Sequence, residues 1–325
     1  MTWVNDEQHM RRAMELAAGV RRLTSPNPWV GSVLQPGGFE GATAPPGGPH
    51  AEVAALQAAG AAARGATLYA TLEPCAHHGR TPPCVDAIVD AGISRVVVGI
   101  EDPDERVRGA GIRALRAAGV AVDVGICAAD VRAQLAPYLK HRATGRPLVV
   151  LKLAATLDGR TAAPDGSSRW ITGDAARADA HRLRAESDAV IVGAGTVRAD
   201  DPALTVRDFA GADPLRVVLG TAPAGARVQP ALELSGDLSG VLDELGRRGV
   251  LQALVEGGAT VAGDFHRAGL VDRYVLYLAP ALFGGDDARP LFAGPGAPTI
   301  ADVWRGRIVS VERLGEDMRI ECSPA

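Results

Sequence analysis

The chain has few aromatic residues, few cysteines and no long apolar run. Phe, Trp and Tyr together make up 4% of its 325 residues, and four residues are cysteine. A membrane-crossing helix needs roughly 20 consecutive apolar residues, and no stretch of the sequence offers them, so we expect no membrane span. The first ten residues lack a basic segment followed by an apolar run, so no secretory signal peptide is expected.

Four cysteines are too few for a disulfide-stabilised scaffold. Cys127 and Cys322 stand outside any motif and are expected to be free thiols, which fits a reducing cytoplasm. The formal net charge of −4 gives no sign of a general nucleic-acid-binding surface. A length of 325 residues predicts two domains, each large enough for a core of its own.

Two short runs, PHAE and EPCAHHGRTPPC, carry the strongest chemical signal in the sequence. His50, Cys75 and Cys84 can hold a zinc ion and leave its fourth position open for water, as in catalytic zinc sites. Glu52, two residues after His50, is placed to move protons without binding the metal. This order of residues is typical of the zinc-dependent nucleobase deaminases.

The expected helices give this spacing a physical reason. An Ala-rich helix is predicted over 52–63, with His50 near its start, and a second helix over 85–91, with Cys84 at its start. Helix N-termini that face one ion favour cysteine thiolates. A chance cluster of core residues is the alternative, and the correct order of all four residues speaks against it.

Eight residues separate Cys75 from Cys84, where many nucleobase deaminases have two. The run TLEPCAHHGRTPPC, with PHAEV before it and NPWVG at 27–31, resembles the deaminase half of the bifunctional riboflavin-biosynthesis deaminase–reductase family. The resemblance implies that Asn27 belongs to the pyrimidine pocket, whereas the local sequence alone favours a turn residue. His77 and Arg80 lie on the loop that would meet the base or the phosphate, and an exposed loop position is the alternative for His77.

Helix and apolar strand alternate along the first half, which predicts an α/β fold with the sheet between helical layers. Strands are expected over 31–34, 67–71, 95–100 and 121–124. The Pro/Gly-rich run 36–49 is expected to be a loop, and a helical tail over 128–141 leads to a Thr-Gly-Arg-Pro linker. With the resemblance, this implies a cytidine-deaminase-like three-layer α/β/α domain over 1–145 and a second domain over 146–325.

The second half is also of α/β type. Strands are expected over 148–153, 189–192, 216–219, 251–255 and 274–278. Glu256-Gly257-Gly258 joins the fourth of these strands to a helix, an arrangement that can bind phosphate through backbone N–H groups. An ordinary turn is the alternative, and no G-x-G-x-x-G run follows a strand, so a Rossmann fold is not indicated.

Four further runs resemble the reductase half of the same family: LKLAATLDGRTA, SSRWITG, GAGTVRADDPALTVR and VEGGATVAGDF. The resemblance implies a dihydrofolate-reductase-like α/β domain that uses NADPH. The family's dinucleotide contacts then fall on Ala154, Trp170, Thr196, Asp200, Thr221, Gly258, Ala259, Thr260, Val261, Ala262, Gly263 and Asp264. The residues that the resemblance places on the substrate side are Lys152, Ser168, Thr172, Arg184, Leu204, Arg207 and Glu256.

The chemistry of some of these residues supports the assignments that the resemblance implies. Arginine forks suit phosphate oxygens, although Arg184 and Arg207 can equally be solvated helix or loop residues. Lys152 inside an apolar strand requires a partner. Asp200 is either a simple turn residue or, by our hypothesis, a group that helps deliver a proton to the ribose during reduction. Gly220-Thr221 replaces the family's usual Asp-Ser pair.

The resemblance covers nearly the whole chain and implies two successive reactions on a small pyrimidine ribotide. The amino group is removed by zinc-dependent hydrolysis, and NADPH then reduces the ribosyl group to a ribityl chain. Related enzymes also suggest a homo-oligomer. Three alternatives stay open: a deaminase of another substrate, a reductase with an inert N-terminal domain, and a non-catalytic ligand-binding or scaffolding protein.

Overall fold

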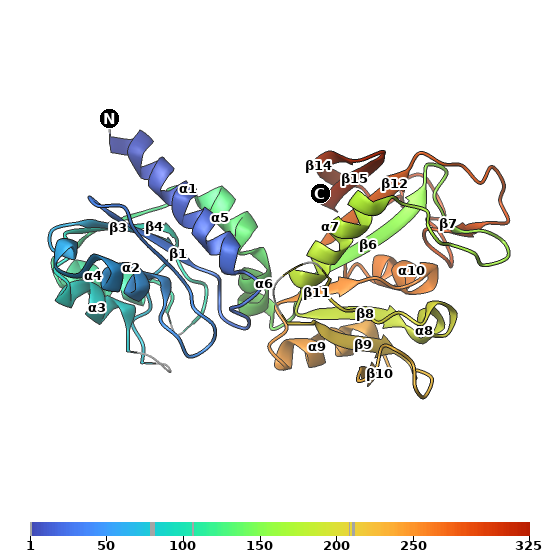
Figure 1. Cartoon of the computed structure of the whole chain (residues 1–325), viewed down its shortest axis with the longest axis horizontal. Helices are drawn as coiled ribbons and strands as arrows, with labels where there is room; N and C mark the ends of the chain where they lie inside the picture. Colours follow the sequence, from blue (N-terminus) through green and yellow to red (C-terminus); the bar gives the residue numbers. More distant parts are fainter. Residues whose placement is uncertain (1, 79–81, 106, 208, 210–211) are drawn as a thin grey trace. The chain divides into compact units, whose positions relative to one another are not determined.

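The chain forms two compact units, Met1–Gly145 and Arg146–Ala325, in a computed structural model (Figure 1). The structure describes residues 2–78, 82–105, 107–207, 209 and 212–325. Each unit is built around its own β-sheet. No helix within these described ranges has the length and apolar character needed to cross a membrane.

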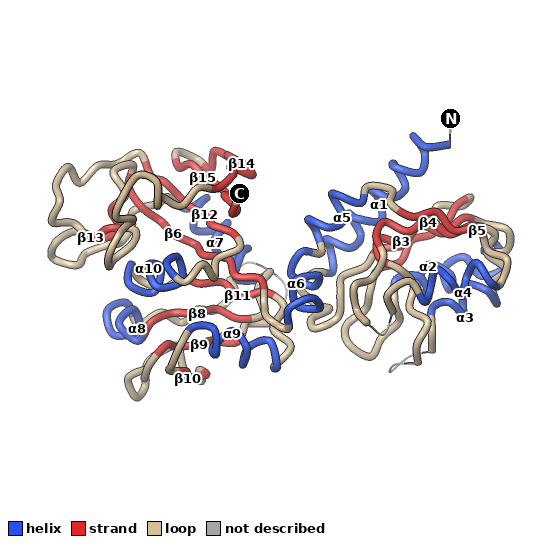
Figure 2. Tube along the Cα trace, turned by 180° about the vertical axis from the view of Figure 1, so that it is seen from behind, coloured by secondary structure: helices blue, strands red, loops and turns tan. Residues whose placement is uncertain are grey.

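The first unit is a five-stranded sheet between two helical layers. In sheet order, its strands are β2 (Phe39–Ala42), β1 (Gly31–Gln35), β3 (Thr67–Leu72), β4 (Arg95–Ile100) and β5 (Ala121–Val124). The strand β1 runs antiparallel to β2 and β3, whereas β3, β4 and β5 are parallel. One face carries α1 (Thr2–Val20) and α5 (Ala128–Gln134), and the other carries α2 (Ala51–Ala59), α3 (Cys84–Asp90) and α4 (Ala110–Ala117) (Figures 1 and 2). The unit ends with α6 (Ala136–Thr144).

Apolar side chains on the helices and strands explain this layering. Leu68 and Val96 on neighbouring strands pack in one buried cluster with Leu56, Ile88 and Leu115, which come from α2, α3 and α4. Burial of such side chains is the main favourable contribution to folding. The cluster fixes the starts of α2 and α3, where His50 and Cys84 lie.

Three expectations for this unit need correction. The run 36–49 is not all loop, because Gly37 and Gly38 adopt positive φ and turn the chain into the short strand β2. The helix expected over 128–141 is two helices, because Pro137 lacks the N–H group that a continuous helix requires. The helix expected over 52–63 ends as α2 at Ala59 and continues as a 3₁₀ turn, Gly60–Ala63.

The second unit contains an eight-stranded sheet. In sheet order, its strands are β10 (Leu232–Leu234), β9 (Leu215–Leu219), β8 (Ala189–Gly193), β11 (Gln252–Val255), β6 (Leu148–Thr156), β12 (Arg273–Ala279), β15 (Asp317–Pro324) and β14 (Gly306–Leu314). The pairs from β10 to β12 are parallel, and the last two pairs are antiparallel. A separate ribbon pairs β7 (Arg160–Ala162) with β13 (Arg289–Pro290).

Helices cover both faces of this sheet. The helices are α7 (Asp174–Ala185), α8 (Ala194–Asp200), α9 (Leu238–Arg247) and α10 (Ala259–Arg267). Leu245 of α9 and Phe265 of α10 pack in a cluster with Leu151 of β6, so these two helices share one face. On the other face, Tyr277 of β12 donates a hydrogen bond to Asp179 of α7 at 2.6 Å. The carboxyl ends of the parallel strands meet at one edge, where ligands of such sheets bind.

Candidate functional site

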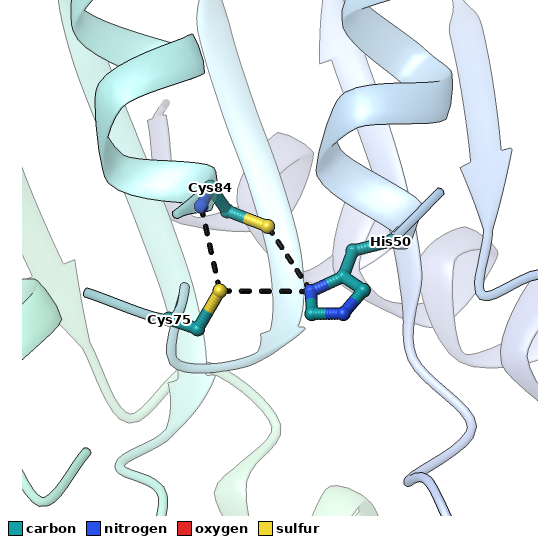
Figure 3. Close-up of side chains that lie close together, drawn as sticks. All are labelled: His50, Cys75 and Cys84. Atoms are coloured by element: carbon teal, nitrogen blue, oxygen red, sulfur yellow. Dashed lines mark hydrogen bonds between the residues drawn. The ribbon is translucent and has the colours of Figure 1, made fainter. Parts of the chain in front are cut away.

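The structure brings His50, Cys75 and Cys84 together in the first unit (Figure 3). His50 is the N-cap of α2, Cys75 follows β3, and Cys84 is the first residue of α3. The Nδ1 atom of His50 lies 3.6 Å from Sγ of Cys75 and 3.2 Å from Sγ of Cys84. The backbone N–H of Cys84 also donates to Sγ of Cys75 at 3.4 Å, so the two cysteines hold each other in place.

This donor set fits a metal ion. The ligand atoms all lie within 4.8 Å of one another, and one imidazole with two thiols suits zinc. A hydrogen bond from Cys84 lowers the pKa of Cys75 to about 4, and the same contact, with burial, raises the pKa of Cys84. The lowered pKa of Cys75 favours the thiolate form, which is the form that binds a metal ion. Three protein ligands would leave the fourth position of a tetrahedral ion open, as at catalytic sites.

Glu52 lies in the first turn of α2 and is only 4% exposed. Burial raises the pKa of its carboxyl group to about 7. Glu52 lines the same cavity as His50 and Cys75. A carboxyl group with a pKa near neutrality can both accept and donate a proton at physiological pH, which is what a general acid–base group needs.

The cavity has a volume of about 510 Å³ and lies within the first unit. Asn27 and His77, both expected on the substrate side, line it. Arg80 lies outside the residues that the structure describes. Sequence reasoning missed a group of polar lining residues, namely Glu73, Asp102, Asp104, Tyr138 and Arg142. Glu73 opens the EPCAHHGRTPPC run, whereas Asp102, Asp104, Tyr138 and Arg142 come from segments far apart in the sequence that no local motif marks.

Glu73 has a structural role in the cavity wall. Its carboxylate accepts hydrogen bonds from the backbone N–H groups of Asp102 at 3.1 Å, Gly109 at 2.9 Å and Ile112 at 3.1 Å. These bonds tie the end of β3 to the start of α4 and occupy both oxygens of the carboxylate. Glu73 therefore supports the loop that carries Cys75 and has no role left as a proton shuttle.

Three residues predicted for the reductase substrate side form a buried charge cluster in the second unit. The Arg184 guanidinium makes a two-point contact with the Glu256 carboxylate, its Nη2 at 2.8 Å from Oε2, and Lys152 Nζ lies 3.9 Å from the same oxygen. Burial raises the pKa of Glu256, but the charges of Arg184, Lys152 and His181 together outweigh burial, so this pKa is lowered. Two cations against one carboxylate leave a net positive site at the end of β11, which suits an anionic ligand.

The start of α10 fits an anionic cofactor group. Its N-cap is Gly258, which has no side chain to accept a hydrogen bond from the first N–H groups of the helix, and such groups can bind an anion. The Gly258 N–H donates to Oγ1 of Thr196, on α8, at 3.1 Å. A Cβ atom on Gly257 would approach Val261 to 2.5 Å, so a side chain there would displace the turn. Thr196 thus lies against Gly258, the first residue of the 258–264 segment.

The remaining predicted residues lie in the same unit without a shared cluster. Ala154 is on β6, two positions from Lys152. Trp170 is 70% exposed, with the Arg177 guanidinium 4.5 Å from its ring. The Asp200 carbonyl accepts a hydrogen bond from Arg169 at 2.8 Å. Thr172 and Leu204 are buried, Ser168 is half-buried, and Arg207 and Thr221 are exposed.

Comparison with known proteins agrees with this geometry. Residues 4–100 match the family "Cytidine and deoxycytidylate deaminase zinc-binding region", and residues 147–320 match "RibD C-terminal domain". Riboflavin biosynthesis protein RibD of Escherichia coli K12 is 38% identical, with 97% of this chain and 98% of that protein covered. The Mycobacterium tuberculosis H37Rv protein is 43% identical, with 96% and 95% covered. The chain belongs to the RibD family.

Solved structures of RibD proteins share the fold. Acinetobacter baumannii RibD, form 1, superimposes with a TM-score of 0.94 at 39% identity, covering 99% of each chain. A Thermotoga maritima deaminase/reductase gives a TM-score of 0.92 at 33% identity, covering 100% of each chain. Membership of the RibD family makes the chain a bifunctional enzyme of riboflavin biosynthesis, with a zinc-binding deaminase domain and a reductase domain that uses NADPH. The expected α/β fold class is confirmed.

Proposed function

We propose that the first unit deaminates 2,5-diamino-6-ribosylamino-4(3H)-pyrimidinone 5′-phosphate. The second unit then reduces the ribosyl group with NADPH and gives 5-amino-6-ribitylamino-uracil 5′-phosphate. One observation carries this proposal: a single cavity joins Glu52 to the metal-binding cluster. The similar Thermotoga maritima protein is described as a diaminohydroxyphosphoribosylaminopyrimidine deaminase/5-amino-6-(5-phosphoribosylamino)uracil reductase.

In the deaminase step, His50, Cys75 and Cys84 would hold the zinc ion. Zinc, when bound, lowers the pKa of water toward neutrality and so supplies a nucleophile at physiological pH. The Glu52 carboxylate accepts a proton from the attacking water and delivers it to the departing amino group. Its pKa of about 7, raised by burial, suits both transfers. Asn27 and His77, which line the cavity, and Arg80 on the loop orient the pyrimidine ribotide.

In the reductase step, the positive cluster of Lys152 and Arg184 with Glu256 binds the ribotide. Ser168, Thr172, Leu204 and Arg207 complete the substrate side. Thr196 and the start of α10 would hold the dinucleotide, because the N-terminus of a helix favours phosphate. Ala154, Trp170, Asp200 and Thr221 make the remaining cofactor contacts. NADPH, when bound, supplies the reducing equivalents.

Asp200 delivers the proton that the opened ribose takes up during reduction. Support for this role is its place in α8, the helix that follows the carboxyl end of β8 and also carries Thr196. Asp200→Asn should slow the reductase step and leave deamination intact. An unchanged rate of NADPH oxidation with the deaminated ribotide would rule out this role.

Two expectations from the sequence stay predictions: self-association of the chain and a cytoplasmic location. Sedimentation of the full-length protein at several concentrations tests the first, and cell fractionation tests the second.

A coupled assay tests the proposed function. The diaminopyrimidinone ribotide is given to zinc-loaded protein, and ammonia release is followed with and without NADPH. We expect ammonia release without NADPH, followed by NADPH oxidation that depends on prior deamination. Ammonia without any NADPH oxidation would contradict the reductase half, and the absence of ammonia would contradict the deaminase half.

A further inference from the structure

The deaminase cavity is rich in carboxylates and poor in cations. Four acidic residues line it, Glu52, Glu73, Asp102 and Asp104, whereas Arg142 is the one Lys or Arg side chain among the described lining residues. The proposed substrate carries a phosphate monoester of charge about −1.5 to −2 at neutral pH. Without a cation nearby, these carboxylates would repel it. Among the described lining residues, Arg142 is therefore the cation that can offset this repulsion.

Two of the four carboxylates are already engaged by neutral donors. The Glu73 oxygens accept three backbone hydrogen bonds, and the Tyr138 hydroxyl lies 3.1 Å from each oxygen of Asp102. Burial raises the pKa of Asp102 to about 6, so part of its charge is also titrated near neutrality. The wall around Asp102 is thus less repulsive to an anion than a count of acidic residues suggests.

Arg142 is held in the cavity without using up its donors. It lies on α6, one turn after Tyr138, and its guanidinium carbon is 5.2 Å from the centre of the Tyr138 ring. Its Nη1 is 3.7 Å from Oδ2 of Asp104, which is longer than a hydrogen bond. Its Nε is buried and has no hydrogen-bond partner among the described residues. The Nε atoms of Arg21, Arg160 and Arg319 are in the same state, but of these four arginines only Arg142 lines the cavity, where a bound ligand can supply the partner that a buried N–H group normally has.

The support beneath Arg142 is rigid. Tyr138 is 4% exposed and is fixed by its hydroxyl on Asp102. The Asp104 N–H donates to Oδ1 of Asp102 at 2.9 Å, which fixes the turn after β4. An arginine that stacks on a fixed aromatic ring loses less conformational entropy when it binds an anion.

We propose that Arg142 binds the 5′-phosphate of the ribotide in the deaminase cavity and sets the preference for phosphorylated over dephosphorylated substrate. Its Nε and Nη groups would donate to two phosphate oxygens, since the guanidinium fork matches phosphate geometry. The loose contact with Asp104 holds the fork ready when the cavity contains no substrate. This role rests on the proposed deaminase function and adds a specificity-determining residue to it.

The test compares ammonia release from the ribotide and from its dephosphorylated riboside. Both substrates are given to the wild type, Arg142→Ala, Arg142→Lys and the matched control Arg132→Ala, an exposed residue of α5 outside the cavity. We expect Arg142→Ala to lower kcat/KM for the ribotide about 10- to 100-fold, the range that loss of a charged hydrogen bond gives. The loss should lie mainly in KM. Activity on the riboside should not change, Arg142→Lys should keep part of the preference, and Arg132→Ala should match the wild type.

Each other outcome counts against the proposal. An equal loss on both substrates would show that Arg142 only supports the fold, because the riboside reports on the same cavity without the phosphate. An unchanged ribotide KM would place the phosphate elsewhere. If the wild type released no ammonia from the ribotide, the proposed deaminase function would fail first, and the role of Arg142 with it.

Discussion

A substitution of Glu52 should affect the deaminase step and leave the reductase step intact. Glu52→Gln keeps the size of the side chain but removes its ability to exchange a proton. Since general acid–base groups contribute about 10²- to 10⁴-fold, we expect ammonia release to fall by that factor. Zinc content, measured by elemental analysis, should stay at the wild-type level, and reduction of the deaminated ribotide should continue. Full deaminase activity in the variant would exclude Glu52 as the proton carrier.

Tyr138 and Asp102 give the first unit a pH-dependent stability. Burial raises the pKa of Asp102 from 3.8 to about 6. The stabilising contribution of Asp102 to the free energy of unfolding is therefore complete below pH 3.8 and is lost as the pH rises through 6. The Tyr138 hydroxyl lowers this pKa by donating to the ionised carboxylate. Tyr138→Phe should therefore cost about 1.5–3 kcal/mol of unfolding free energy at pH 8, and less at pH 5.

Urea unfolding of the full-length protein, followed by hydrogen exchange in peptides of the first unit, measures this difference. The wild type at the same two pH values is the reference. A loss that is equal at pH 5 and pH 8 would show that the hydroxyl does not act through the charge of Asp102.

At the scale of elements, the close approach of α4 to the loop after β3 supports the metal-binding cluster. A Cβ atom on Gly111 would lie 1.9 Å from the carbonyl oxygen of Pro74, which directly precedes Cys75. Gly111→Ala must push α4 and this loop apart, a change that costs about 1–3 kcal/mol when packing is dense. We expect faster zinc loss to a chelator and slower ammonia release, with reduction of the deaminated ribotide unchanged.

Gly19→Ala is the matched control for this substitution, because a Cβ atom there meets no atom within 4 Å. It should retain zinc as the wild type does. Zinc retention in Gly111→Ala equal to that of Gly19→Ala would mean that the loop carrying Cys75 does not depend on α4.

Elements with continuous apolar runs could be predicted from the sequence, and elements with mixed runs could not. The run 95–100 forms β4 and the run 148–153 lies within β6, because buried parallel strands are mostly apolar; Arg95 and Lys152 are the charged residues of these two runs. The strand β14 was missed, since exposed and charged residues such as Arg307 and Glu312 interrupt its pattern. The helix α9 was missed as well, although its Asp237 N-cap accepts a hydrogen bond from the Gly240 N–H and is a recognisable start signal.

The residues of the site could likewise be predicted only where a local sequence motif marks them. His50, Cys75 and Cys84 could be grouped in advance, because each lies in a short motif at the start of a helix or the end of a strand. Tyr138 and Arg142 could not, because only the packing of α6 brings them to the cavity that holds Asp102 and Asp104. Their contacts join residues more than 30 positions apart, a separation at which local patterns carry no signal.

At the scale of the whole molecule, each unit has the groups for one of the two reactions. His50, Cys75 and Cys84 all belong to Met1–Gly145, and they are the one such metal-binding group that the described residues contain. The proposed reductase residues all belong to Arg146–Ala325. Removal of zinc from the full-length protein by a chelator should therefore abolish ammonia release, while NADPH oxidation with the deaminated ribotide continues at the wild-type rate. Added zinc should restore the first activity, since a chelated ion leaves its protein ligands intact. Both assays are run on one sample, so that loss of protein affects them equally. A parallel loss of both activities on chelation would mean that the reductase depends on the folded, zinc-loaded state of the first unit.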